Sequence, residues 1–147
     1  MINSLSVPVN STWANIAWGE GHDSTSGRHF IDLDLFEDHD KIKKLHEDGH
    51  KVICYFSAGT WEKGRPDGNK SDWAKVKIGK MDGWDELWLD IRKLDTLKTL
   101  MGSRMDLAHT YGCDGVEPDN IDCSDNKECW HSMTSPSVSS GSKVKAD

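Results

Sequence analysis

The amino-acid sequence predicts an α/β fold organised around a parallel β-sheet. Two observations lead to this class. Residues 29–57 follow the order strand, helix, strand, which is the order of a parallel βαβ unit, and a second helix pattern leads directly into a strand pattern at residues 114–120. The chain of 147 residues is long enough for one domain with a core and gives no reason to expect two.

The first two predicted strands differ in clarity. Residues 13–18 form a short, mostly apolar run, and loop-forming residues through Arg28 separate it from the next strand. Residues 29–35 alternate apolar and acidic side chains with a period of two, which is typical of a strand with one buried face. Asp32 and Asp34 should therefore lie on the face opposite the apolar residues.

A helix and a buried strand follow. Asp38 can cap a helix that ends at Gly49, where a left-handed residue is favoured. Residues 51–57 are an apolar run short enough to be a fully buried strand. We interpret Cys54 in this run as a small buried hydrophobic residue rather than a nucleophile, whereas Cys113 could be buried or paired.

The middle of the chain combines an irregular stretch with a clear helix. Residues 61–83 have no clean period and predict a long functional loop that holds a short helix near Trp73. Residues 86–91 predict a further strand. The best helix pattern in the chain then opens at Asp95 and stops at Gly112, and its Met and Leu stripe indicates core packing.

The strand pattern at residues 114–120 carries two carboxylates and an amide. Since residues two apart on a strand point to the same side, Glu117 and Asp119 should project together. A solvated turn is the alternative interpretation, because Asp-Gly, Pro-Asp and Asn all favour turns. Residues 121–147 are rich in Ser, Asp, Asn and Lys and predict a long loop that leads to the next helix.

Acidic residues recur near the C-terminal ends of the predicted strands. The carboxyl ends of parallel strands meet on one face, so these residues favour a shared acidic cleft over a set of turns. They are Asp32, Asp34, Asp90, Glu117 and Asp119.

Two chemistries use such a cleft. Glycoside hydrolysis needs one protonated carboxyl and one carboxylate about 5 to 9.5 Å apart. A metal-dependent hydrolase could instead hold Mg²⁺ or Ca²⁺ with Asp32, Asp34 and Asp119. The predicted strand ends lack His, which weakens a zinc site more than a magnesium site.

The composition argues against two classes of partner. A net charge of -7, from 18 Lys and Arg against 25 Asp and Glu, does not suit nucleic acid, which needs a concentrated basic face. No apolar run approaches the roughly 20 residues that cross a bilayer, so we expect no membrane partner. The seven Trp residues weakly favour a carbohydrate ligand, because the broad indole face complements the C–H bonds of a sugar, although Trp is also common in protein cores.

Signs of secretion are mixed. Residues 1–8 have neither the basic start nor the apolar core of a signal peptide. Glycosylation sequons at Asn10 and Asn69 nevertheless suit a secretory compartment. Cys123 and Cys129 are close enough for a disulfide in an oxidising environment, and a metal site is the competing interpretation, although no CxxC or His pair has zinc-finger spacing.

Taken together, four blocks of sequence and the triplet Arg65-Pro66-Asp67 resemble glycoside hydrolase family 114. The resemblance extends over about residues 13 to 147, and the combination is specific although each block alone is not. The blocks are FIDLDLF at 30–36, KVICYFSAG at 51–59, WLDIR at 88–92 and GCDGVEPDN at 112–120.

The resemblance implies a secreted (β/α)₈ barrel that cleaves α-1,4-galactosaminoglycan or related α-galactosidic substrates without a metal or other cofactor. Asp119 is the implied nucleophile, with Glu117 the second choice. Trp61 either stacks on a sugar or packs internally. The other residues that the resemblance places along the substrate cleft are Asp32, Asp34, Tyr55, Asp90 and Asn120.

The length departs from the family, because a complete barrel needs further strands. We therefore expect residues 1–147 to form a partial (β/α)₈ barrel with about five parallel strands, truncated at its C-terminal side. The partner acid should lie beyond Asp147, and this form could be inactive without it. Two alternatives remain: a non-catalytic secreted carbohydrate-binding or structural protein, and a metal-dependent hydrolase.

Overall fold

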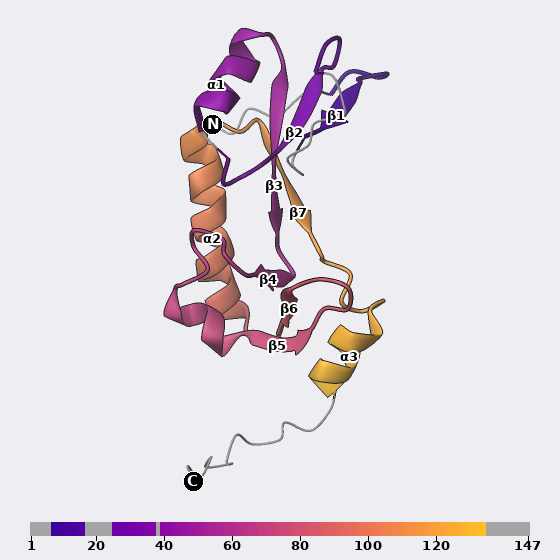
Figure 1. Ribbon diagram of the computed structural model, residues 1–147, viewed down its shortest axis with the longest axis vertical. Coiled ribbons are helices and arrows are strands. Elements are labelled where there is room, and N and C mark those ends of the chain that lie inside the picture. Colours follow the sequence, from indigo (N-terminus) through magenta and orange to yellow (C-terminus); the bar gives the residue numbers. More distant parts are fainter. Residues whose placement is uncertain (1–6, 17–24, 38, 135–147) are drawn as a thin grey trace.

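Two small β-sheets and the helices beside them make up the described part of the chain. The computed structural model describes residues 7–16, 25–37 and 39–134. A parallel sheet and an antiparallel sheet lie at opposite ends of the molecule, and helix α2 (Leu94–Tyr111) runs alongside both of them (Figure 1).

The larger sheet has four strands that all run parallel, so the predicted α/β class is confirmed. Successive residues on each strand alternate between its two faces. The sheet has four parallel strands, where about five were expected. In sheet order they are β1 (Trp13–Asn15), β2 (Phe30–Asp34), β3 (Lys51–Ser57) and β7 (Gly115–Asp119).

The smaller sheet is antiparallel and was not predicted. Its strand order is β4-β6-β5, and a 3₁₀ helix, η1 (Ser71–Lys75), precedes β5. The short helix near Trp73 is thus confirmed, but the loop predicted for 61–83 is wrong in part, and the strand predicted at 86–91 is not a parallel strand. The strands are β4 (Thr60–Glu62), β5 (Lys77–Lys80) and β6 (Glu86–Leu89).

The helices agree with the sequence where glycine marks their ends. Helix α1 (His39–Glu47) is followed by Gly49 at φ +89°, and α2 by Gly112 at φ +83°, both in the left-handed region that favours glycine. Helix α3 (Lys127–Thr134) lies inside residues 121–147, so the prediction of a continuous loop there is wrong.

Three expectations fall wholly or partly on positions that the structure does not describe. Helix α1 is observed from residue 39, and its predicted cap Asp38 lies outside the described residues. Of the first predicted strand, residues 13–15 form β1, while positions 17 and 18 are also outside the described residues. The same holds for residues 135–147 of the predicted final loop.

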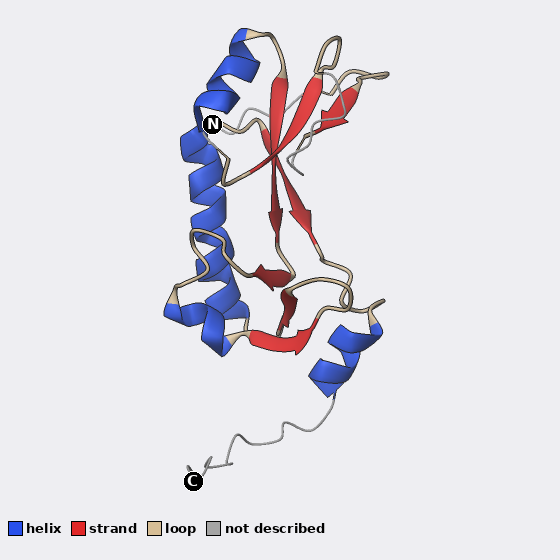
Figure 2. Ribbon diagram, viewed as in Figure 1, coloured by secondary structure: helices blue, strands red, loops and turns tan. Residues whose placement is uncertain are grey.

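One face of the parallel sheet forms the main core. Helices α1 and α2 lie along the same side of the sheet (Figure 2), and they pack on its apolar residues. The alternation predicted for β2 is therefore correct. The strand residues of this core are Ile31 and Leu33 from β2 and Val52, Cys54 and Phe56 from β3.

A second cluster joins the small sheet to α2. Trp73 of η1, Leu89 of β6 and Leu100 of α2 are buried together. The pairing of three short strands separated along the chain depends on this contact rather than on a period in their own sequence, which explains why the sheet was not predicted.

Arg104 connects the two clusters from within α2. Its side chain is 1% exposed. Its guanidinium donates to both carboxylate oxygens of Asp67, at 2.9 and 3.0 Å, and to the Ser57 carbonyl at 2.5 Å. Its charged carbon lies 4.9 Å from the ring centroid of Trp73, a cation–π contact. One side chain thus ties α2 to the end of β3 and to the segment before η1.

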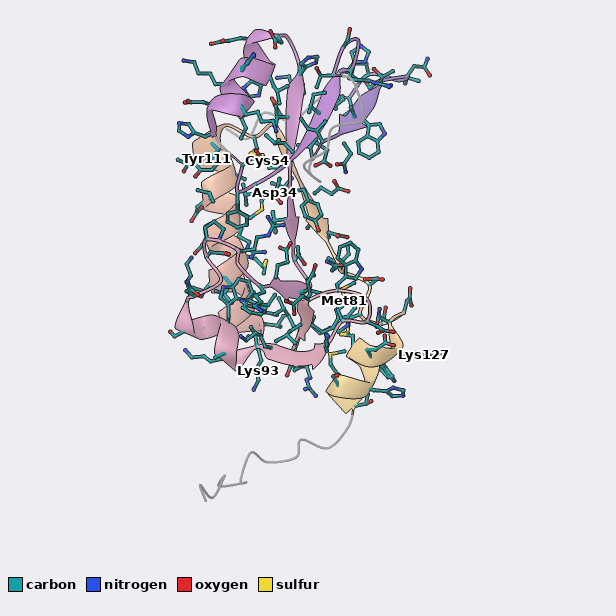
Figure 3. All side chains as sticks on the ribbon, in the orientation of Figure 1. Asp34, Cys54, Met81, Lys93, Tyr111 and Lys127 are labelled. Atoms are coloured by element: carbon teal, nitrogen blue, oxygen red, sulfur yellow. A yellow bond between two sulfur atoms is a disulfide. The ribbon has the colours of Figure 1, made fainter. Side chains whose placement is uncertain are left out.

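Two disulfides cross-link the described chain. Cys54 of β3 is bonded to Cys113, and Cys123 is bonded to Cys129 (Figure 3 labels Cys54). The predicted Cys123–Cys129 bridge is confirmed. Cys54 is buried in the main core, as expected, and the structure in addition pairs it with Cys113, for which pairing was one of the two alternatives.

We predict that Arg104→Met lowers the free energy of unfolding by about 3–5 kcal/mol, because it leaves the half of a buried ion pair contributed by Asp67 without its partner. Urea denaturation measures the change. Lys98→Met, which removes a charge from an exposed position of the same helix, should have little effect. Equal losses in the two variants would contradict the assigned role of Arg104.

The two disulfides should differ in their contribution to stability. From loop-closure entropy, we expect removal of the Cys54–Cys113 bond, which spans 59 residues, to cost about 4 kcal/mol. Removal of Cys123–Cys129, with a separation of 6, should cost about 2 kcal/mol. Denaturation of the two double Cys→Ala variants tests this order, and the reverse order would show that native contacts dominate.

Candidate active site

The polar face of the parallel sheet lies opposite the main core. The strand register places Tyr55 of β3 beside Asp34 of β2 and Glu117 of β7. Two residues further along both strands, towards their carboxyl ends, Asp119 pairs with Ser57. Side chains that are distant in sequence therefore share one face because the strands are parallel and in register.

The predicted nucleophile lies in a pocket at these strand ends. The Tyr55 hydroxyl donates a 2.9 Å hydrogen bond to Asp119 Oδ2. Burial raises the pKa of Tyr55 well above its ordinary value, and the bond to Asp119 raises it further, so the phenol stays a donor. The pocket has a volume of about 140 Å³ and is lined by Tyr55, Met81, Trp84, Glu86, Asp119 and Asn120.

The pocket lies between the two sheets. Asp119, Tyr55 and Asn120 come from the parallel sheet and its strand ends, while Glu86 begins β6 of the small sheet. Asp34, at the end of β2, and Met81, just after β5, mark the two sheets in Figure 3. Sequence reasoning placed only the parallel strands around the cleft.

Asp32 and Glu117 form a carboxyl pair on the same polar face. Asp32 is 2% exposed. Burial, a hydrogen bond to Glu117 and the negative charges of Glu117 and Asp34 raise the pKa of Asp32 from 3.8 to about 8. At neutral pH Asp32 is therefore protonated and donates to the Glu117 carboxylate. Glu117, the second choice for nucleophile, is engaged in this pair and does not line the Asp119 pocket.

Asn120 is fixed by the turn that follows β3. It adopts φ +58°, and its amide nitrogen lies 3.0 Å from Ser57 Oγ and 3.3 Å from Thr60 Oγ1. A Cβ added at Gly59 would lie 1.7 Å from the Asn120 carbonyl oxygen, so only glycine fits at this crossing. The backbone at the end of β7 is thereby held against β3.

Arg65 joins the two sheets electrostatically. Its guanidinium donates to Asp34 Oδ2 and to Glu62 Oε1, both at 2.5 Å. Burial lowers the pKa of Arg65, but the two carboxylates outweigh it and the net shift is upward, so Arg65 stays charged. Asp34 Oδ1 accepts from the Phe36 N–H at 2.9 Å. Asp34 therefore positions Arg65 in this structure, whereas the resemblance placed it on the substrate.

Two predicted cleft residues lie elsewhere. Asp90 follows β6 in the small sheet and is held by Arg92 through both carboxylate oxygens, at 2.7 and 2.9 Å. It is not at the end of a parallel strand, so the reason given for placing it in the cleft is wrong. The indole N–H of Trp61 donates to Gly68, and Lys77 Nζ lies 3.9 Å from the Trp61 ring centroid. Of the two interpretations given for Trp61, stacking on a sugar or internal packing, these contacts support packing.

Trp84 and Glu86 are the site residues that sequence reasoning missed. Trp84 is 53% exposed and lines the pocket together with Glu86. Burial raises the pKa of Glu86, and the negative charges of Glu62 and Asp119 raise it further, while the Thr60 hydrogen bond and the charge of Arg65 lower it; the net shift is upward. Both residues follow the turn at Asp82-Gly83, the one signal that could have placed them at an exposed sheet end.

The structure does not bring together the ligands that a metal-dependent hydrolase would need within the described residues. Among residues 7–16, 25–37 and 39–134, no group of three or more His, Cys, Asp or Glu side chains is arranged to hold a metal ion. The suggested set of Asp32, Asp34 and Asp119 is thus not brought together. Within the same residues, no helix is long and apolar enough to cross a membrane.

Comparison with known proteins decides the family. The model of glycoside-hydrolase family GH114 matches residues 2–137. The chain belongs to this family. The crystal structure of Aspergillus fumigatus Ega3 in complex with galactosamine is 36% identical and superposes with a TM-score of 0.75 over 85% of this chain. The resemblance stated from the sequence blocks is confirmed.

A more distant structure supports the fold of this GH114 chain. The glycoside hydrolase domain of PelA from Pseudomonas aeruginosa is 16% identical, with a TM-score of 0.59 over 79% of the chain. The chain spans 50% of the Ega3 structure and 46% of the PelA structure. The four parallel strands agree with a partial (β/α)₈ barrel. Comparison with curated proteins gave no match.

The Asp32–Glu117 pair predicts a pH dependence of stability. Because the pKa of Asp32 is raised on folding, the folded state binds more protons than the unfolded state between pH 3.8 and about 8. The free energy of unfolding should fall as pH rises through this window, by up to about 1.4 kcal/mol per pH unit.

The variant Asp32→Asn should remove this contribution, because its amide donates to Glu117 without titrating. Chemical denaturation from pH 4 to 9 measures both proteins, and the variant should gain stability relative to wild type as pH rises. Parallel curves for the two proteins would refute the shared proton.

Proposed function

We propose that the GH114 domain to which this chain belongs hydrolyses α-1,4-galactosaminoglycan or a related α-galactosidic glycan. The observation that carries the proposal is the Asp119 carboxylate, oriented by Tyr55 in a pocket at the carboxyl ends of parallel strands. Membership of the GH114 family supports glycoside hydrolysis. The galactosamine bound by the 36% identical Ega3 supports the sugar class.

In the proposed reaction Asp119 is the nucleophile. It attacks the anomeric carbon while a second carboxyl, in its acid form, protonates the leaving glycosidic oxygen. Water, deprotonated by that second group, then releases the sugar from Asp119. The Tyr55 hydroxyl keeps one oxygen of Asp119 hydrogen-bonded, which leaves the other directed to the reaction. No metal or other cofactor takes part in this scheme.

The second carboxyl in this proposal comes from a part of the GH114 domain that this chain does not span, since the chain covers 50% of the Ega3 structure. Strand β7, which carries Asp119, is at the edge of the parallel sheet in the described part of the chain. If the acid lies outside this chain, the chain itself binds the glycan without cleaving it, so carbohydrate binding without turnover is the second candidate function. Binding of the glycan with no release of reducing ends would support it.

We also propose that the protein matures in a secretory, oxidising compartment. All four cysteines of the sequence are paired in two disulfides. Structural disulfides form and persist in such compartments and are rare in the reducing cytosol.

We predict that Asp119→Asn in the full-length protein lowers release of reducing ends from partly deacetylated galactosaminogalactan at least about 100-fold. Tyr55→Phe should lower it about tenfold, since it removes one charge-assisted hydrogen bond. Asp122→Asn, exposed and three residues away, is the matched control.

Unchanged hydrolysis by Asp119→Asn would rule out this nucleophile. The assay is repeated in EDTA, where we expect full activity; loss of activity that added Mg²⁺ or Ca²⁺ restores would favour the metal-dependent alternative.

A further inference from the structure

Two triplets of the sequence have the form that accepts an N-linked glycan and take no part in the proposed reaction. They are Asn10-Ser11-Thr12 and Asn69-Lys70-Ser71, and neither has Pro in its middle position. Because such triplets also arise by chance, what separates them is whether the folded chain can carry a glycan at each asparagine.

Asn69 ends a turn at the surface of the molecule. The turn lies between β4 and η1, and Asn69, Lys70 and Ser71 are all exposed. Lys70 is extended, at φ -62° and ψ 134°, and the 3₁₀ helix begins at Ser71. The residue that η1 buries is Trp73, which is 1% exposed. A glycan on Asn69 therefore extends into solvent without displacing a core side chain.

The backbone of this turn is held from its inner side. The Asp67 carbonyl accepts hydrogen bonds from the Lys70 N–H at 3.2 Å and from the Trp73 indole N–H at 2.9 Å. Arg104 donates to both oxygens of the Asp67 carboxylate. None of these bonds uses the side chain of Asn69. Modification of the Asn69 amide therefore leaves the contacts that fix the turn intact.

Asn10 is less well placed, although it is also exposed. The Thr12 hydroxyl of its triplet donates a 2.9 Å hydrogen bond to the Gly27 carbonyl. The triplet also borders an apolar pocket of about 280 Å³, and exposed apolar surface favours contact with protein over a polar glycan. Of the two asparagines, Asn69 is therefore the better acceptor. The pocket is lined by Val7, Ser11, Trp13, Phe30 and Ile53.

Both disulfides support exposure of the chain to an oxidising secretory compartment, where structural disulfides form and persist. N-linked glycans are attached to secreted proteins during the same passage. The inference therefore rests on the proposed secretory maturation, and it does not depend on the proposed hydrolysis.

We propose that Asn69 is an N-glycosylation site, with its glycan on the outer surface of the turn before η1. The side-chain nitrogen of Asn69 forms a bond to the anomeric carbon of the first sugar, which is donated by an oligosaccharide linked to a lipid diphosphate. The bond from that carbon to the phosphate oxygen breaks, and the lipid diphosphate leaves with the proton lost by the amide. Asn69 does not line the Asp119 pocket.

Mass spectrometry of the full-length protein, secreted by eukaryotic cells, tests the site. Peptide N-glycosidase F removes an N-linked glycan and converts the asparagine that carried it to aspartate, and heavy-oxygen water distinguishes this conversion from spontaneous deamidation. We expect the conversion at Asn69 in wild type. Ser71→Ala, which keeps Asn69 but removes the hydroxyl of the triplet, should abolish it, and Ser71→Thr should retain it. Lys70→Arg, which leaves the triplet valid, is the matched control.

An unmodified Asn69 in wild type, or a modification that persists in Ser71→Ala, overturns the site. Alkylation of cysteines without prior reduction separates this result from the proposed compartment. Paired cysteines with an unmodified Asn69 would refute the glycan and leave secretory maturation standing, whereas free cysteines with an unmodified Asn69 would refute both. Release of reducing ends tests the hydrolysis independently, because Asn69 lies outside the Asp119 pocket.

Discussion

The buried guanidinium of Arg104 is the constraint on which the arrangement of the two sheets depends. It binds the Ser57 carbonyl at the end of β3 and the Asp67 carboxylate in the segment between β4 and η1. These contacts hold the small sheet at the carboxyl ends of the parallel strands. The pocket around Asp119 exists because Glu86 and Trp84 are brought there from that small sheet. A helix side chain that touches no part of the pocket therefore determines its shape.

The carboxylates of the site are stabilised in three different ways. Asp32 and Glu117 share a proton, so this pair carries one negative charge rather than two at neutral pH. Arg65 compensates Asp34 and part of Glu62, while Asp119 accepts a hydrogen bond from Tyr55. Of these groups, Asp119 is the one that lines the pocket of about 140 Å³.

How well the sequence predicts the structure depends on whether the interactions involved are local or between residues distant in the chain. The alternation in 29–35 and the glycines after both long helices are local signals, and they placed the parallel strands and the helix ends correctly. The small sheet depends on contacts between distant residues, such as Arg104 with Asp67, and no local pattern encodes them. For the same reason Trp61 and Trp84 looked alike in sequence, although one is packed and the other lines the pocket.

The disulfide between Cys54 and Cys113 encloses the small sheet within a covalent loop. Everything from the end of β3 to the end of α2 lies between its two sulfurs. A protease that cut the exposed turn at Asp82-Gly83 would produce two pieces that stay joined, with the parallel strands still linked to each other. A cut in the segment that shapes the cleft would therefore not release the strand that carries Asp119.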